Sequence, residues 1–481
     1  MAWFAILIRI EIGETMNMNV CQEHLSISSS LLRTRQLVTV FLSLIIAVMS
    51  LFFSRSAFAV PSFARQTGQS CVACHAGGQF PELTPYGRMF KLTGYTIGDR
   101  SNPLAAMIVA SATKTQNNND GAGGSLSPLD RKAILDFGSI FLAGKVTDNV
   151  GGFAQFTYSH YDHQDTAGNW HDHFGSDNFD LRYADRKVDD RNDLIWGLTL
   201  HNNPTVQDVW NSTPAWGYPY VSSTKGAFSG LPASTLVEGA LAQHVAGVGG
   251  YVYWNNSIYA ELTSYQTAKN FWSFLSMGNK TGDANHALTH LNGSSPYWRL
   301  AYTHERDAHN VMVGAFGIDA KTYPLDASFN PTTVFGSTRY KDLGFDAQYQ
   351  YLLSPHTFTA QVRSIREKID DSTLLTFGGP ATLKTLKAKA SYVYRATYGA
   401  SLSYTDVKGS ADATAYAGSA LNVPDTAMWT PELFWIPKQN LRIGVQFNYF
   451  TRYFGAGTNY DGNGRNARDN NTTYLYLWTS F

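Results

Sequence analysis

Alternation of apolar and polar residues dominates the chain from about residue 104 to its end. In one stretch, for example, Leu441, Ile443 and Val445 alternate with Arg442 and Gly444. A period of two with one apolar face predicts β-strands. The pattern predicts sixteen strands, at about 104–115, 132–144, 150–162, 177–187, 192–202, 240–254, 256–267, 295–305, 309–320, 338–352, 356–368, 381–394, 396–407, 425–437, 440–453 and 471–481.

The gaps between these strands are alternately short and long. Long connections are expected at 116–131, 163–176, 203–239, 268–294, 321–337, 369–380, 408–424 and 454–470. An even number of strands with short periplasmic turns and long outer loops is typical of outer-membrane barrels. A soluble sandwich or propeller is the alternative, but neither predicts this alternation. We therefore expect an all-β fold, a 16-stranded antiparallel outer-membrane β-barrel with both chain ends in the periplasm.

Composition agrees with a barrel that faces lipid outside and a polar lumen inside. The 481 residues are 44% hydrophobic, 14% aromatic and only 15% charged, with 41 glycines. Ordinary soluble domains carry about 25% charged residues. Lys+Arg and Asp+Glu balance at 37 each, which argues against nucleic acid as a partner.

The N-terminus carries an export signal. An apolar run at 37–53 follows Arg33 and Arg35 and leads to Ala57 and Ala59. A basic region, an apolar core and a small-x-small site together indicate a cleaved secretory signal peptide, with a membrane anchor as the alternative. We expect a signal peptide with an N-terminal extension at 1–59, which removes Cys21, a second segment at 60–103 and a barrel at 104–481.

The second segment contains the motif with the strongest chemical content. Cys71, Cys74 and His75 form C-x-x-C-H, the attachment signature of c-type haem. The two thiols form thioethers and His75 becomes the axial iron ligand. A redox disulfide would not need His75, and a zinc site would need a fourth ligand nearby. The cofactor expected is one covalently attached haem c.

The ligand opposite His75 stays open at the level of sequence. Met89 and Met107 both carry a thioether that binds haem iron, while a histidine from the barrel or an open position is equally admissible. Three cations flank the motif and are candidates for haem propionate contacts or for solvated surface charges: Arg65, Arg88 and Lys91. Phe80, Pro81 and Phe90 are candidate haem-packing residues.

Two of the long connections suggest further roles. The first is rich in histidine and aspartate, and His160, His163, His171 and His173 are candidate ligands for an extracellular metal ion, with a solvated polar loop as the alternative. The second, at 203–239, is the third long loop. By analogy with general 16-stranded porins, it is expected to fold inward and to narrow the lumen or cover the haem.

Several motifs resemble the outer-membrane cytochrome–porin fusions of iron-oxidising bacteria and related monohaem porins. The runs that carry the resemblance are Pro61 to Gly68, Phe80 to Arg88, Phe90 to Leu92, Trp210 to Gly217, Gly464 to Ala467 and Asp469 to Thr472. The resemblance implies a 16-stranded barrel with one haem in the lumen, held by Cys71, Cys74 and His75. It also implies electron flow from an extracellular donor, ferrous iron in the best-known members, to periplasmic carriers.

These features favour an electron-transfer protein of the outer membrane. The partners expected are outer-membrane lipid, an extracellular reductant and a periplasmic carrier such as a soluble cytochrome. A solute porin with a structural or sensory haem is the second hypothesis. A haem enzyme such as a peroxidase is the third, if the position opposite His75 is open.

Overall fold

The computed structural model describes most of the chain after residue 60. The described residues are 61–78, 81–119, 124–165, 167–218, 222–223, 225–226, 231–278 and 284–481. The expected signal peptide, Cys21 and Phe80 therefore lie outside the described residues. Among those that are described, no helix is both long enough and apolar enough to cross a membrane.

Sixteen antiparallel strands close into one barrel, in which each strand pairs with its sequence neighbours and β1 pairs with β16. The strands are β1 Leu104–Thr115, β2 Ala133–Lys145, β3 Val150–Gln164, β4 Trp170–Val188, β5 Asp193–His201, β6 Val245–Trp254, β7 Ile258–Thr267, β8 Ser295–Arg306, β9 His309–Thr322, β10 Thr338–Leu353, β11 His356–Asp370, β12 Ala381–Tyr394, β13 Tyr398–Gly409, β14 Thr426–Lys438, β15 Leu441–Arg452 and β16 Thr472–Ser480. Closure leaves no strand edge unpaired. The predicted fold class and strand number are confirmed.

The two faces of the barrel differ in chemistry, as the alternation predicted. On β7, Leu262 is 71% exposed, while its neighbours Glu261 and Thr263 point inward and are buried. Exposed aromatic side chains such as Trp254, Trp435 and Tyr398 gather near the short turns. An apolar outer band flanked by aromatic residues is the lipid-facing surface of an outer-membrane barrel.

The connections alternate in length with one exception. Residues 163–176 were expected to form a long loop, but β3 runs to Gln164 and β4 begins at Trp170, so the turn spans only 165–169. A membrane strand needs about 9–11 residues, whereas β3 has 15 and β4 has 19. This hairpin therefore extends beyond the lipid, where polar residues on both faces hide the strand pattern.

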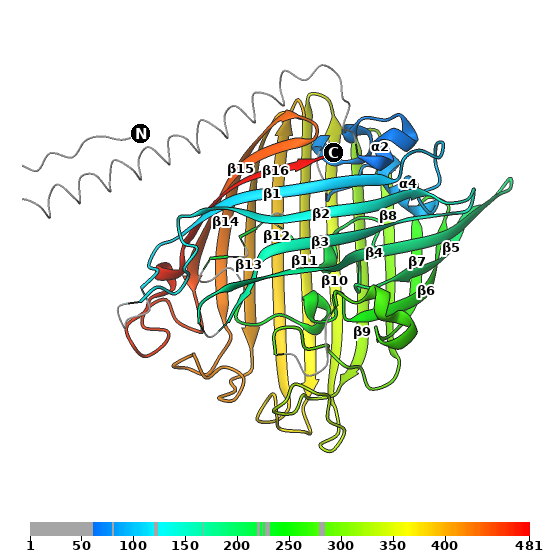
Figure 1. Cartoon of the computed structure of the whole chain (residues 1–481). Helices are drawn as coiled ribbons and strands as arrows, with labels where there is room; N and C mark the ends of the chain where they lie inside the picture. Colours follow the sequence, from blue (N-terminus) through cyan, green and yellow to red (C-terminus); the bar gives the residue numbers. More distant parts are fainter. Residues whose placement is uncertain are drawn as a thin grey trace, which may run out of the picture. The chain divides into compact units, whose positions relative to one another are not determined.

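Two further segments occupy the lumen. The first, 61–103, contains α2 Ser62–Thr67, α3 Cys71–Cys74, η1 Ala76–Gly78 and α4 Pro85–Leu92, and lies at the mouth formed by the short turns, where the C-terminus also lies (Figure 1). We call it the plug. The second, 202–244, connects β5 to β6 and contains η2 Pro214–Trp216 and η3 Leu236–Ala240. We call it the inner loop. Two one-turn helices, η4 Asn270–Leu275 and η5 Ala467–Asn470, lie in other long connections.

Candidate cofactor site

The cysteine motif is held by backbone bonds at the mouth of the barrel. Cys71 and Cys74 begin and end α3, and the Cys71 amide donates to Oε1 of Gln439, in the turn between β14 and β15, at 3.0 Å. His75 pairs with Leu83 as a β-bridge, and the Thr84 amide donates to the Cys74 carbonyl at 2.9 Å. The motif is thus fixed both to the rest of the plug and to the barrel rim.

Helix α4 packs closely against this turn because of three residues at its start. Thr84 is the N-cap and its hydroxyl accepts from the Gly87 amide, while Pro85 occupies the first helical turn, where no amide is needed. A Cβ on Gly87 would lie 2.2 Å from the Cys74 carbonyl oxygen. Only glycine allows this approach, which sets the helix directly beside the cysteines.

A cavity of about 270 Å³ opens beside the motif, between the plug and one side of the barrel wall. Both cysteines and His75 line it. The large aromatic and apolar side chains that line it are Phe63, Leu83, Phe90, Tyr95, Met107, Phe141, Phe153, Trp216 and Trp478. An apolar cavity with two thiols and an imidazole on one wall suits a flat, apolar group attached through sulfur.

The aromatic lining is a connected set rather than a scatter of rings. Phe63 lies edge-on to Phe90 at 4.9 Å between ring centroids and stacks on Tyr95 at 5.4 Å. Tyr95 in turn meets Phe153 of β3 at 6.0 Å and donates its hydroxyl to Asp180 of β4 at 2.6 Å. These contacts hold the plug residues that line the cavity against β3 and β4 of the barrel wall.

Burial keeps the motif side chains neutral. It lowers the pKa of His75 to about 4, although the nearby carboxylate of Glu82 acts in the opposite direction. Burial likewise raises the pKa of Cys71, and that of Cys74 to about 11. A neutral imidazole is the form that ligates a metal. Thiols of this kind differ from redox-active thiols, whose pKa is lowered.

The structure separates the two candidate methionines. Met107, on β1, lines the cavity together with His75. Met89 does not line it and instead packs against a buried cluster that includes Leu92, Ile195 and Trp210. The sequence offered both thioethers, and the structure brings only Met107 to the cavity.

The three flanking cations have structural partners in the protein. Arg65 donates to the Leu104 and Asn102 carbonyls. Arg88 is buried in the lumen and contacts Glu305 of β8, Asn310 of β9 and Gln350 of β10. Neither Arg65 nor Arg88 lines the cavity, whereas part of Lys91 does.

Lys91 joins the plug to the inner loop. Its Nζ donates to the carbonyls of Val206 and Asp208, at 2.8 and 2.6 Å, and to Oδ1 of Asn211 at 3.0 Å. Asn211 returns a bond to the Pro81 carbonyl at 2.6 Å. Residues 206–211 of the 203–239 connection therefore fold inward, as expected, and contact the plug.

A buried charge network fixes the inner loop to the wall, and its pairing could not be predicted from the alternation of residues. Arg299 of β8 contacts Asp208 of the loop at 3.3 Å and Asp346 of β10 at 2.9 Å, and all three side chains are fully buried. Ser212 of the loop donates to the same Asp346. Polar residues at inward strand positions were the available signal, but alternation alone does not identify partners.

A second anchor of the inner loop makes its attachment dependent on pH. Glu238 pairs with Lys387 at 3.0 Å and with Arg363 at 3.2 Å. Burial alone would raise the pKa of Glu238, but the two cations outweigh it and lower the pKa from 4.5 to about 2. A carboxyl whose pKa is lower in the folded state stabilises that state fully above pH 4.5 and less as the pH falls toward 2.

We therefore expect hydrogen exchange of 236–240, corrected for its intrinsic rate, to quicken by up to about tenfold per pH unit below pH 4.5. Glu238→Gln should remove this dependence, because the amide does not titrate. Unchanged protection of the wild-type segment between pH 5 and 2.5 would contradict the assignment.

The histidine-rich stretch is a paired hairpin rather than the expected loop. His163 of β3 lies opposite His171 of β4, with ring centroids 5.1 Å apart. His173 is near this pair and its Nε2 bonds with the Met277 carbonyl at 2.6 Å. His160 contacts Tyr158 and Tyr161 instead.

The chain was compared with protein families, curated proteins and solved structures, and matches were found among the solved structures. No protein-family model and no curated protein matches the chain. Among solved structures, OmpF of Salmonella typhi in complex with daunomycin is 14% identical, with a TM-score of 0.43, over 79% of this chain and 97% of its own. The outer membrane channel DcaP of Acinetobacter baumannii is 11% identical, with a TM-score of 0.43, over 79% and 96%. An anion-selective porin from Comamonas acidovorans is 11% identical, with a TM-score of 0.41, over 79% and 98%.

Proposed function

We propose that this outer-membrane barrel carries one c-type haem in the plug and transfers electrons between an extracellular donor and a periplasmic carrier. The observation that supports the proposal is that Cys71, Cys74 and His75 line one apolar cavity inside the barrel mouth. Cys71 and Cys74 would hold the group through thioethers, and His75 through its imidazole. A haem so held supplies one-electron chemistry.

The protein residues around the cavity have separable roles in this proposal. Phe63, Phe90 and Tyr95 exclude water from one side, and the barrel wall does so from the other. His75 and Met107 both line the cavity, so an imidazole and a thioether are available to the group it would hold. Lys91 ties the plug to the inner loop through the Val206 and Asp208 carbonyls. The chain thus holds its reactive segment in place at the short-turn mouth.

A solute porin with a structural or sensory haem is the second candidate. The closed barrel itself favours it, because a 16-stranded barrel encloses a lumen wide enough for an aqueous channel. The two candidates differ in what crosses the membrane: electrons in the first and solutes in the second.

Covalent haem and its reduction are the test of the proposal. The full chain is matured in cells that attach c-type haem, purified in detergent and compared with Cys71→Ala/Cys74→Ala. We expect covalent haem in the first protein and none in the variant, with heat-dependent gel mobility unchanged because the barrel still closes. In liposomes, an external one-electron donor should reduce the haem, while solute conductance stays low.

The two methionines provide a matched pair of controls. Met107→Leu should alter the spectrum of the reduced haem if its thioether is the ligand opposite His75, and Met89→Leu should not. Covalent haem that resists every donor, together with large conductance, would replace electron transfer by the porin function. Absence of covalent haem after maturation would overturn the assignment of Cys71 and Cys74.

A further inference from the structure

A histidine–carboxylate cluster lies on the hairpin end of β3, far from the cysteine cavity. Asp162 and His163 are near the end of β3, and His286 comes from the connection between β7 and β8. Phe153, on the same strand, lines the cysteine cavity. Nine residues of extended strand separate Phe153 from Asp162, about 30 Å along the barrel wall. The cluster is therefore a separate location.

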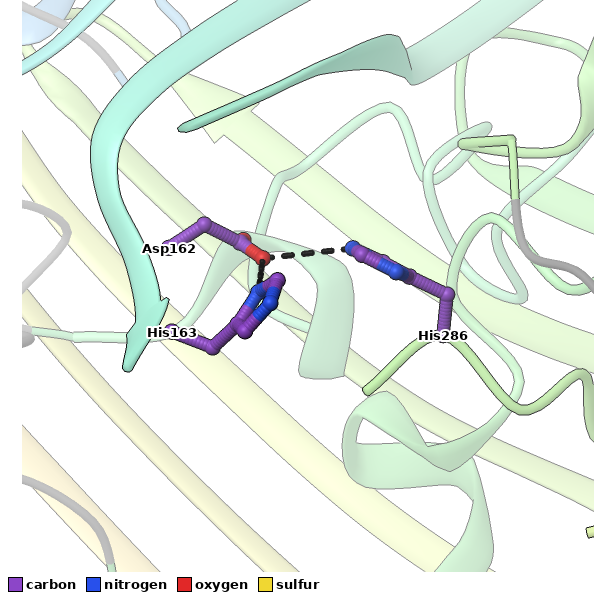
Figure 2. Close-up of side chains that lie close together, drawn as sticks. All are labelled: Asp162, His163 and His286. Carbon is purple, nitrogen blue, oxygen red and sulfur yellow. Dashed lines mark hydrogen bonds and ion pairs between the residues drawn. The ribbon is translucent and has the colours of Figure 1, made fainter. Parts of the chain in front are cut away.

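The three side chains converge on one point (Figure 2). Oδ2 of Asp162 lies 2.9 Å from Nδ1 of His163 and 3.2 Å from Nε2 of His286. All three candidate ligand atoms lie within 4.8 Å of one another. Ligand atoms about 2.1 Å from a metal, at right angles to one another, are about 3 Å apart. The two carboxylate–imidazole distances already have this value.

Two more imidazoles support the ligands from behind. The ring of His171 stacks on His163 at 5.1 Å, and that of His173 stacks on His286 at 4.6 Å. His171 also contacts Asp165, and His173 is held by the Met277 carbonyl. The two stacked rings restrict rotation of the His163 and His286 imidazoles.

The cluster is open enough for an ion to enter. The side chains of His163, Asp162 and His286 are 25%, 26% and 16% exposed. The carboxylate of Asp162 supplies a negative charge that attracts a dication. Two histidines with one carboxylate bind first-row transition metals and leave coordination positions for water.

We propose that Asp162, His163 and His286 form a binding site for a first-row divalent transition-metal ion. The carboxylate oxygen and one nitrogen of each imidazole would hold the ion, and water would occupy the remaining coordination positions. The site differs from the four histidines expected from sequence, since Asp162 and His286 are ligands and His160 is not. It does not depend on the haem proposal.

Titration with Co²⁺ and Zn²⁺ tests the site on the Cys71→Ala/Cys74→Ala protein, which excludes any contribution of haem iron. We expect one high-affinity ion per chain, seen as a Co²⁺ visible spectrum that Zn²⁺ abolishes. Asp162→Asn, His163→Ala and His286→Ala should each weaken binding at least tenfold. Heat-dependent gel mobility checks that each barrel is closed, and His163→Gln and His286→Gln replace any alanine variant that fails this check.

His356→Ala is the matched control, because this exposed histidine lies at the short-turn end and contacts Tyr392 rather than the cluster. The His356→Ala variant should bind Co²⁺ with the same affinity as the Cys71→Ala/Cys74→Ala protein from which it is made. Wild-type affinity in all three ligand variants would overturn the proposal. An equal loss in His356→Ala would do so as well, because it would indicate unspecific binding to surface histidines.

Discussion

Replacing Arg299 with methionine should release the inner loop from the barrel wall. The guanidinium lies between Asp208 and Asp346, and none of the three side chains has solvent access. Its removal leaves two buried carboxylates facing each other without a cation. Loss of one partner from a buried ion pair costs about 3–5 kcal/mol. The loop, which has no strand pairing of its own to the wall, is the part free to move.

The expected result is hydrogen exchange in 206–213 that is faster by roughly two to three orders of magnitude, with the strands still protected. Single-channel conductance should rise at the same time, because the loop leaves the lumen. Arg339→Met is the control, since Arg339 pairs with Asp319 at the surface and should change stability by less than about 1 kcal/mol. Adding Asp346→Asn to Arg299→Met should restore part of the protection, because one buried charge is then removed.

Replacing Arg88 with methionine should loosen the plug itself. Arg88 donates to the Leu83 carbonyl and to Gln350, both at 2.9 Å, to Asn310 at 3.1 Å, and also to Glu305. Methionine fills the space but removes the donor to Gln350 and Asn310, while the Leu83 carbonyl still accepts from Nε2 of Gln350 at 3.1 Å. The Glu305 side chain is 35% exposed, so water can replace the hydrogen bond that it loses with Arg88. The buried neutral acceptors are not compensated, and we expect a loss of about 2–3 kcal/mol.

This loss should appear as faster hydrogen exchange across 81–95 and as proteolytic release of the plug from an intact barrel. Arg186→Met is the control for loss of an arginine as such, since Arg186 pairs with Asp193 at 2.6 Å but is exposed on the rim. We expect no change in plug protection there. Equal effects of the two substitutions would contradict the docking role of Arg88.

The barrel followed from sequence because every strand within the lipid has one apolar face. Leu262 illustrates the rule: its apolar side chain faces the lipid, while its neighbours Glu261 and Thr263 face the lumen. Beyond the lipid the rule fails. Residues such as His160 and His163 lie on β3, where both faces are hydrated, and a strand without an apolar face resembles a loop.

The cysteine motif was also evident, because C-x-x-C-H is local in sequence. Its surroundings were not. On α4, Gly87, Phe90 and Lys91 face the cavity, whereas Arg88 and Met89 face other parts of the lumen. Spacing from His75 could not tell these faces apart, because the direction of α4 is set by its contact with the barrel.

Contacts between residues far apart in the chain could not be predicted from the sequence either, because they depend on how the barrel brings distant segments together. His286 meets Asp162 across 124 residues, and Arg299 meets Asp346 from two different strands. The barrel register decides the second contact, and the path of the connection between β7 and β8 decides the first. The alternation of apolar and polar residues shows neither.

The cavity wall has a consequence for assembly. It is built from β1 to β3 at one end of the chain and from β16 at the other, through Met107, Phe141, Phe153 and Trp478. The first and last strands meet only when the cylinder closes, so the compartment and the seam are completed in one event. A group joined to the two thiols before β1 pairs with β16 would not have to pass through the finished barrel wall. It would gain the last part of its cavity wall when β16 docks.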